Sequence, residues 1–301
     1  MKSIIFDTDM GVDCDDAVAL GILINEEKRK NCKILAITAS TTRTGAVATI
    51  KTICKYYGVP EIPVGVLKGE PLVCDAMNNY AKAVMQKYDE TDEAQCATAL
   101  LRKTLAKAVE KVDIVAVGPL TNIKNLLASG ADEFSPLGGI ELVKEKVGKI
   151  YLMGGAFLEN YKDRTEIFGE WNIMQDVPSA RYVAQYFPCE MLYCPHEVGQ
   201  PVKTKMQYSD NPVWFSMKAF ALSDGQIYEP AFYRQSWDPI TCLAATREDC
   251  ELFSYSAYGK IEISENGRTH FKKEAGNHRF MLVNEKVAEL EKLVNECVER
   301  F

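Results

Sequence analysis

Carboxylate side chains crowd the beginning of this sequence. Asp7 and Asp9 follow a short apolar run, and Asp13, Asp15 and Asp16 come soon after them. Side chains alternate along an extended segment, so Asp7 and Asp9 point to the same side, and the last two acids fall at the expected start of a helix, where the dipole favours them. Helix capping does not account for all five acids, because crowded negative charges repel and raise one another's pKa. A bound cation is the simplest compensation.

Hard oxygen ligands without neighbouring cysteine or histidine favour Ca²⁺ or Mg²⁺ over zinc. The ten cysteines are scattered along the chain, with no Cys-x-x-Cys pair and no Cys/His cluster at zinc spacing. We therefore expect reduced thiols in a cytoplasmic protein.

The overall composition excludes several classes of function. The 42 acids and 35 bases leave a net charge of −7, without the basic footprint of a nucleic-acid binder. No stretch approaches the roughly 20 apolar residues that cross a bilayer, and the first residues are too short an apolar run for a secretory signal. We expect a globular protein with a small-molecule partner, and neither a nucleic acid nor a membrane.

Short runs rich in Ile and Val alternate with longer helical patterns. This alternation predicts a single α/β domain over residues 1–301, with an open, mostly parallel sheet covered by helices on both faces and with insertions near 68–92 and 196–236. Ligands of such sheets bind beyond the carboxyl ends of the strands, which is where the unusual polar residues lie. The expected strands are 3–6, 34–38, 63–66, 113–117, 149–153 and 191–193, and the expected helices are 17–24, 46–57, 93–109, 123–127, 179–186 and 283–298.

The opening motif resembles two enzyme families. Haloacid-dehalogenase phosphatases also begin with a strand and Asp-x-Asp, which would make Asp7 a nucleophile and Asp9 an acid/base with Mg²⁺. Nucleoside hydrolases begin with Asp-x-Asp-x-Gly and an Asp-Asp-Ala helix start. Residues 7–11 (Asp-Thr-Asp-Met-Gly) and 15–17 (Asp-Asp-Ala) are closer to this second pattern. The usual family spacing is two residues shorter, so 13–14 resembles an insertion found in one branch of the family.

Four later segments resemble nucleoside hydrolase motifs in the correct order. Each fits an ordinary turn when taken alone, but their joint order indicates the inosine–uridine-type nucleoside hydrolase family, with its Rossmann-like fold. The segments are Gly-Pro-Leu-Thr-Asn at 118–122, Met-Gly-Gly-Ala-Phe at 153–157, Glu-Trp-Asn-Ile at 170–173 with Asp176, and Trp-Asp-Pro at 237–239.

The resemblance implies hydrolysis of a ribonucleoside, or a related N-riboside, to free base and ribose in nucleoside salvage, through an oxocarbenium-like transition state. It implies a Ca²⁺ ion held by Asp9, Asp16, the Thr121 carbonyl and Asp238, with Asp9 as the general base for the attacking water. Family members are commonly homodimers or homotetramers, so it also implies a homo-oligomer. The substrate-binding residues that it implies are Asp15, Met153, Asn160, Glu170, Trp171 and Asn172.

The sequence departs from the family at the positions of residues that contact the leaving base in familiar members. Familiar members have His directly before the late Asp, where this chain has Trp237, and a His-Gly segment after the third strand, where it has 72–75 (Leu-Val-Cys-Asp). An Asn after the second strand is replaced near Thr42 or Arg43. None of the three histidines falls on the family's acid position.

Other side chains could contact the leaving base. We expect Trp237, Tyr228 or Tyr233 to stack on it, although such aromatics also pack in lids, and His196 is a candidate for protonating it. The base itself stays open. Two alternatives to hydrolysis remain, a non-catalytic calcium-dependent ribose or nucleoside-binding protein, which the missing histidines favour, and an Asp-x-Asp phosphatase that uses Asp7.

Overall fold

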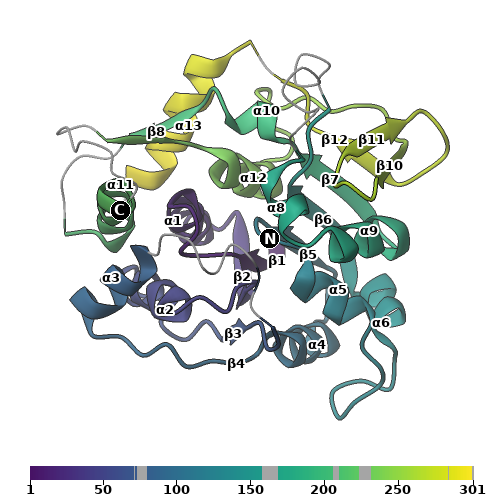
Figure 1. Cartoon of the computed structure of the whole chain (residues 1–301), viewed down its shortest axis with the longest axis horizontal. Helices are drawn as coiled ribbons and strands as arrows, with labels where there is room; N and C mark the ends of the chain where they lie inside the picture. Colours follow the sequence, from purple (N-terminus) through teal and green to yellow (C-terminus); the bar gives the residue numbers. More distant parts are fainter. Residues whose placement is uncertain are drawn as a thin grey trace.

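An eight-stranded sheet forms the centre of the computed structural model, and all its neighbouring strands pair in parallel (Figure 1). The strand order is β12-β7-β6-β5-β1-β2-β3-β4. The structure describes residues 1–70, 72, 80–157, 169–205, 210–223, 232–283 and 285–299. The strands are β1 (Lys2–Thr8), β2 (Cys32–Ala39), β3 (Val64–Val66), β4 (Gln95–Cys96), β5 (Val112–Ala116), β6 (Val147–Met153), β7 (Glu190–Cys194) and β12 (His278–Phe280).

Helices cover both faces of this sheet, as predicted for a single α/β domain. In β1, Ile4 and Phe6 belong to the core on one face and Ile5 to the core on the other, and all three are fully buried. Burial on both faces explains why these strands appear in the sequence as continuous apolar runs. One face carries α1 (Asp15–Lys28), α2 (Ala46–Tyr56), α3 (Tyr80–Tyr88), α11 (Pro212–Ser223), α12 (Trp237–Thr246) and α13 (Val287–Glu299), and the other carries α4 (Ala97–Lys107), α5 (Thr121–Leu127), α6 (Gly139–Lys146) and α9 (Val177–Tyr186).

The six strands expected from the sequence are all present, but two expected helices begin later. The helix expected from residue 93 begins at Ala97, because Gln95 and Cys96 extend the sheet as β4 and pair with Gly65 and Val66 of β3. The closing helix begins at 287 rather than 283. Among the described residues, no helix has the length and apolar character required to span a membrane.

Several short elements lie outside the expected pattern. Two of the strands among them, β8 and β9, pair with each other although they are distant in sequence, which local sequence does not reveal, whereas β10 and β11 pair as neighbours in sequence. The expected insertion near 68–92 contains α3, and that near 196–236 contains α10, α11 and an antiparallel ribbon of β8 and β9. Besides α3, α6, α11, α12, β4 and β12, the elements that the sequence did not predict are α8 (Trp171–Gln175), α10 (His196–Gly199), β8 (Lys203–Lys205), β9 (Tyr233–Gln235), β10 (Lys260–Ile263) and β11 (Thr269–Lys272).

The strand order reverses at β1, which places a crevice at the carboxyl ends of β1 and β5. From β1 the chain builds β2, β3 and β4 on one side, and then returns to build β5, β6 and β7 on the other. Such a switch point is the usual ligand site of an open parallel sheet. Gly118, just after β5, permits the two strand ends to approach, since a Cβ there would lie 2.8 Å from the backbone nitrogen of Asp9.

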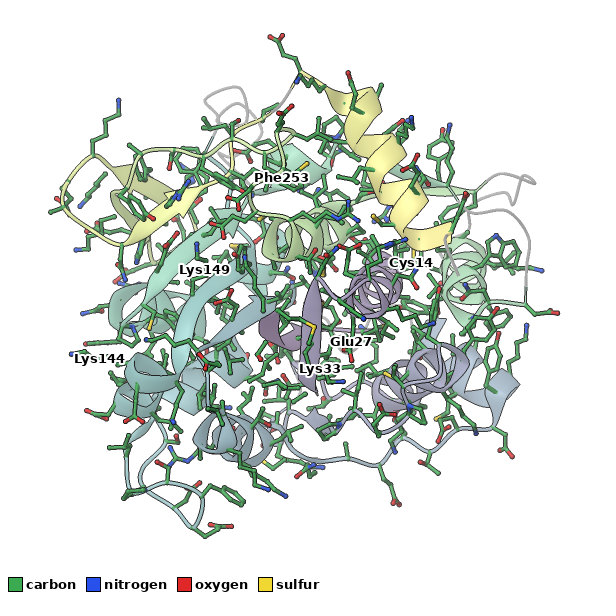
Figure 2. All side chains as sticks on the ribbon, turned by 180° about the vertical axis from the view of Figure 1, so that it is seen from behind. Cys14, Glu27, Lys33, Lys144, Lys149 and Phe253 are labelled. Atoms are coloured by element: carbon green, nitrogen blue, oxygen red, sulfur yellow. The ribbon has the colours of Figure 1, made fainter. Side chains whose placement is uncertain are left out.

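The opposite edge of the sheet, at the amino ends of the strands, carries paired charges. Lys149 of β6 contacts Glu190 of β7 at 3.2 Å and Glu248, after α12, at 2.7 Å. Lys33 of β2 pairs with Glu27 of α1. Figure 2 labels Lys149, Lys33 and Glu27 in the view from behind.

Candidate active site

A cavity opens at the switch point and gathers most of the predicted site residues. Its wall is built from the ends of β1, β5 and β6 and from α1, α8, α10, α11, β9 and α12. Segments far apart in sequence thus meet at the carboxyl edge of the sheet. The predicted residues in its lining are Asp9, Asp15, Asp16, Met153, Glu170, Trp171, Asn172, His196, Trp237 and Asp238.

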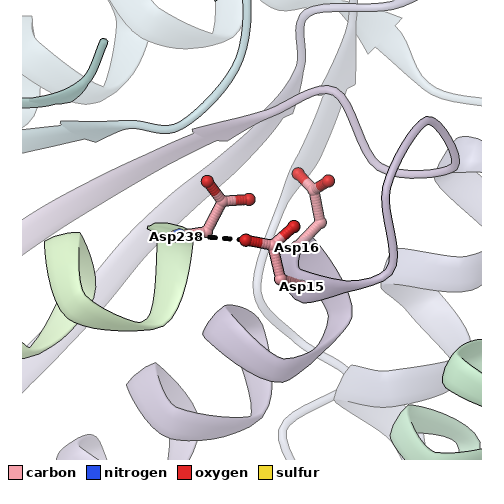
Figure 3. A group of neighbouring side chains, drawn as sticks. All are labelled: Asp15, Asp16 and Asp238. Atoms are coloured by element: carbon pink, nitrogen blue, oxygen red, sulfur yellow. Dashed lines mark hydrogen bonds between the residues drawn. The ribbon is translucent and has the colours of Figure 1, made fainter. Parts of the chain in front are cut away.

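Three buried carboxylates form the centre of this cavity. Oxygens of Asp15, Asp16 and Asp238 all lie within 4.8 Å of one another (Figure 3). The first two come from the first turn of α1 and the third from the first turn of α12, so both helix dipoles favour negative charge at this point. The backbone N–H of Asp238 donates to the carboxylate of Asp15 at 3.1 Å, which fixes the two helix ends to each other.

The donor set of this cluster fits a divalent cation with hard oxygen ligands. Burial raises the pKa of all three carboxyls well above the usual range, and repulsion from neighbouring acids adds to it. One oxygen of Asp16 accepts from the Thr8 hydroxyl, while Oδ2 is buried and has no hydrogen-bond partner among the described residues. A cation would both offset the charge and coordinate that oxygen.

Asp9 and Thr121, the other two predicted metal ligands, are placed differently. Asp9 lines the same cavity but does not belong to the group within 4.8 Å. Burial raises its pKa to about 8, with smaller contributions from Asp13 and Glu170. Thr121 is absent from the described lining. Its hydroxyl donates at 2.6 Å to the carboxylate of Asp176, the residue directly before α9.

The wall at β6 and α8 is polar and rigidly held. Glu170 caps α8 by accepting from the backbone N–H groups of Asn172 and Ile173 at 2.9 and 3.1 Å, and burial raises its pKa to about 7. The amide of Asn172 donates to the carbonyls of Val117 and Met153 at 3.0 and 3.3 Å. These bonds connect β5, β6 and α8 around one side of the cavity.

The other wall is aromatic. The rings of His196 and Trp237 stack with centroids 5.3 Å apart and planes 28° apart. The indole N–H of Trp237 donates to the His196 carbonyl at 3.0 Å. Gly199 permits this packing, since a Cβ there would lie 2.5 Å from Cα of Trp237. Aromatic rings therefore line the cavity beside its acidic centre.

Comparison of the sequence with protein-family models identifies the family of the chain. The model of the inosine-uridine preferring nucleoside hydrolases matches residues 4–291 of the chain. The chain belongs to this family.

Individual relatives are distant. The pyrimidine-specific ribonucleoside hydrolase RihA of Klebsiella pneumoniae (strain 342) is 28% identical over 192 residues, which is 58% of this chain and 56% of the relative. The matched part thus spans little more than half the length of that curated hydrolase.

Two solved structures share the fold. The plant nucleoside hydrolase PpNRh1 has a TM-score of 0.73 at 20% identity, covering 99% of this chain and 98% of that one. The inosine-uridine preferring nucleoside hydrolase from Bacillus anthracis has a TM-score of 0.72 at 17% identity, covering both chains fully.

Asp7 has a structural place in this nucleoside hydrolase fold. It is fully buried, absent from the described cavity lining, and accepts from the Thr38 hydroxyl and, at 2.8 Å, from the Asn122 amide. These bonds connect β1 to β2 and α5. The phosphatase alternative requires an accessible nucleophile at this position, and the geometry does not favour it.

Sequence reasoning did not single out Arg234, which lines the cavity from β9. Its neighbour Tyr233 was expected to stack on the nucleoside base, but it is 49% exposed and absent from the described lining. The amine of Lys203 lies 4.5 Å from its ring centroid. No signal in the local sequence distinguishes these two residues, because β9 has only three residues, Tyr233–Gln235. Asn160 and Tyr228 lie outside the described residues.

Proposed function

We propose that this protein hydrolyses the N-glycosidic bond of ribonucleosides, or of related N-ribosides, to free base and ribose. The observation that carries the proposal is one cavity that joins the carboxylates of Asp15, Asp16 and Asp238 to Asp9 and to an aromatic wall, in a chain of the nucleoside hydrolase family. The relatives are named for different base preferences, one pyrimidine-specific and one inosine-uridine preferring. These names agree on ribonucleosides as the class of substrate but differ in the base.

Ca²⁺ is the cofactor that we propose, and Mg²⁺ would satisfy the same oxygen donors less readily, because it demands a stricter octahedral geometry. The residues that would hold it are Asp16 and Asp238, with Asp9, the Thr121 carbonyl and Asp15 as further candidates. When bound, the ion would supply positive charge that makes a water more acidic and attracts the hydroxyls of ribose.

The protein side chains carry the remaining chemistry. Asp9 takes a proton from the attacking water as general base, and the bond from the sugar to the base breaks with its electron pair going to the base. Asp15, Glu170 and Asn172 hydrogen-bond the ribose hydroxyls, with Met153 and Trp171 completing the sugar pocket. A deoxyribonucleoside leaves buried polar groups unpaired and is therefore rejected.

The aromatic wall would hold the base. Trp237 offers a flat surface for stacking, and His196, beside it, is the candidate proton donor to the departing base.

By family resemblance we also propose a homodimer or homotetramer, which sedimentation would measure.

Released ribose, assayed over a panel of ribonucleosides and deoxyribonucleosides with and without chelator, tests this proposal. We expect turnover of ribonucleosides only, loss of turnover with chelator, and loss with Asp9→Ala. Asp249→Ala, which changes an exposed acid outside the cavity, is the matched control and should keep full activity. Equal rates on both sugars, or a fully active Asp9→Ala protein, would refute the scheme.

Trp237 in the place of the family's histidine favours one alternative, a nucleoside-binding protein without turnover. Calorimetry separates the two. Calcium-dependent binding of a ribonucleoside without release of base or ribose would favour the alternative.

A further inference from the structure

The cavity lining holds two chemically different groups of side chains besides its acidic centre. Glu170 and Asn172 are polar, whereas Trp237 and Phe220 are aromatic. The hydroxyls of a sugar match the first group and the plane of a base matches the second. Arg234 lies beside the aromatic group, with its guanidinium carbon 4.9 Å from the ring centroid of Phe220 and 5.3 Å from that of Trp237.

Contacts on several sides fix the direction of the Arg234 side chain. The strand β9 that carries it pairs with β8, where Thr204 lies opposite. The guanidinium forms a two-pronged ion pair with Asp13, in which Nε donates to Oδ1 at 2.9 Å and Nη2 donates to Oδ2. A planar guanidinium that is held by a carboxylate fork and by aromatic faces has lost most of its rotational freedom before any ligand arrives.

One part of this guanidinium remains available to a ligand. Of the three nitrogens, Nε and Nη2 are engaged by Asp13. The structure gives Nη1 no hydrogen-bond partner within the described part of the chain, and the side chain is 21% exposed and lines the cavity. Arginine keeps its charge at any physiological pH, so Nη1 offers two fixed N–H donors and a positive charge without giving up a proton.

Building on the proposed function, we infer that Arg234 stabilises the leaving base. As the bond from C1′ to the base nitrogen breaks, its electron pair moves into the base, and charge accumulates on the carbonyl oxygen or ring nitrogen nearby. The Nη1 donors bind that charge, the water oxygen bonds to C1′, and Asp9 accepts the proton of the water. The base then takes a proton, for which His196 is the candidate donor, and Arg234 keeps all of its own.

This role predicts a class of substrate. Bases that depart as anions, as uncharged nucleosides release them, gain from a fixed positive charge. Pyridinium ribosides release a neutral base and carry a positive charge beforehand, so Arg234 repels them and gives their departure no help. Asp13 acts through Arg234 and is a positioning residue.

The test compares leaving groups that differ in their need for help. Uridine and inosine release poor leaving groups, whereas p-nitrophenyl β-ribofuranoside releases a stable anion. We expect Arg234→Met to lower kcat/KM for the two nucleosides by about 10²–10³-fold, the range seen when one donor to a developing anion is removed, and to leave the activated riboside nearly unchanged. Arg234→Lys should recover part of the loss, because the charge is kept and the fork is not. Asp13→Asn should show the same selective loss, only smaller.

Lys203→Met is the control, because it removes a cation from the same ribbon at a residue absent from the described lining. Parallel losses on all substrates in Arg234→Met and Arg234→Lys would mean a structural role only, and would overturn the inference. Should Arg234→Met fail to fold, the substrate ratio of Arg234→Lys decides instead. A wild-type protein that cleaves none of these ribosides would refute the proposed function itself, which is a separate result.

Discussion

The two ends of the central sheet hold their charged side chains in opposite ways. At the amino ends of the strands, Lys2 and Lys149 donate to the carboxylate of Glu248 at 3.2 and 2.7 Å. Burial alone would raise the pKa of Glu248, but its hydrogen bonds and the nearby positive charges outweigh burial and lower the pKa to about 2. At the carboxyl ends, burial prevails and raises the pKa of Asp9 to about 8 and that of Glu170 to about 7.

The difference follows from the supply of basic partners. Among the described residues that line the cavity, Arg234 is the one guanidinium or amine, and it pairs with Asp13. Buried acids without basic partners reduce the stability of the fold, and such perturbed groups cluster where proteins bind or react. The amino end of the sheet thus contributes stability, and the carboxyl end gives up stability for a binding site.

Asp16→Asn should have the largest effect and would sharpen this contrast. Asparagine keeps the size of the side chain but removes a charge and a carboxylate oxygen that lacks a partner in the described chain. We expect kcat/KM on ribonucleosides to fall by roughly 10³-fold. Without metal, the unfolding temperature should rise, because repulsion within the cluster decreases. Added Ca²⁺ should no longer stabilise the variant, which scanning calorimetry measures.

Asp113→Asn is the matched control for that experiment. Asp113 is a partly buried acid of β5 at the amino end, and its carboxylate accepts from the Lys149 backbone N–H at 3.1 Å. Its replacement should leave turnover and the response to Ca²⁺ unchanged. An Asp16→Asn protein with full turnover and an undiminished Ca²⁺ response would break the comparison of the two ends.

Trp237→Ala should have the next largest effect. Loss of the stacking surface is expected to raise KM for ribonucleosides about tenfold, within the roughly 1–3 kcal/mol that stacking of one base contributes, and Trp237→Phe should recover most of it. Tyr233→Ala, at an exposed aromatic of the neighbouring ribbon, should leave KM unchanged. Steady-state kinetics on uridine and inosine measure both, and equal effects at the two positions would contradict the placement of the base.

The sequence predicted the part of the site that depends on strand ends. Asp9 follows β1 and Met153 ends β6, and the parallel sheet brings such strand ends to one edge. The fold class followed from the same alternation of strands and helices. Asp16 lies at the helix start that its motif indicated, whereas Asp238 lies in the first turn of α12, a helix that the sequence did not predict.

The missed part depends on long-range pairing. Arg234 faces the cavity because β9 pairs with β8 and because Asp13 holds its guanidinium, and neither contact is visible in local periodicity. A three-residue strand carries too short a pattern to show which of Tyr233 and Arg234 points inward. The role of Asp7 was ambiguous for a related reason, because its partners Thr38 and Asn122 come from β2 and α5.

Glu248→Gln has the smallest expected effect and tests the amino end. This change removes the negative charge that Lys2 and Lys149 share. We expect the free energy of unfolding at pH 7 to fall by only about 1–2 kcal/mol, because this carboxylate is partly exposed and its ion pairs are screened. The value of kcat/KM should stay unchanged. A carboxyl group with a lowered pKa stabilises the fold above its unfolded pKa, and this contribution disappears as the pH falls through the folded value. The difference between wild type and variant should therefore stay constant from pH 7 to about pH 5 and vanish toward about pH 2. Urea unfolding at a series of pH values measures it, and a loss of turnover in this variant would show that the two ends of the sheet are not separate in function.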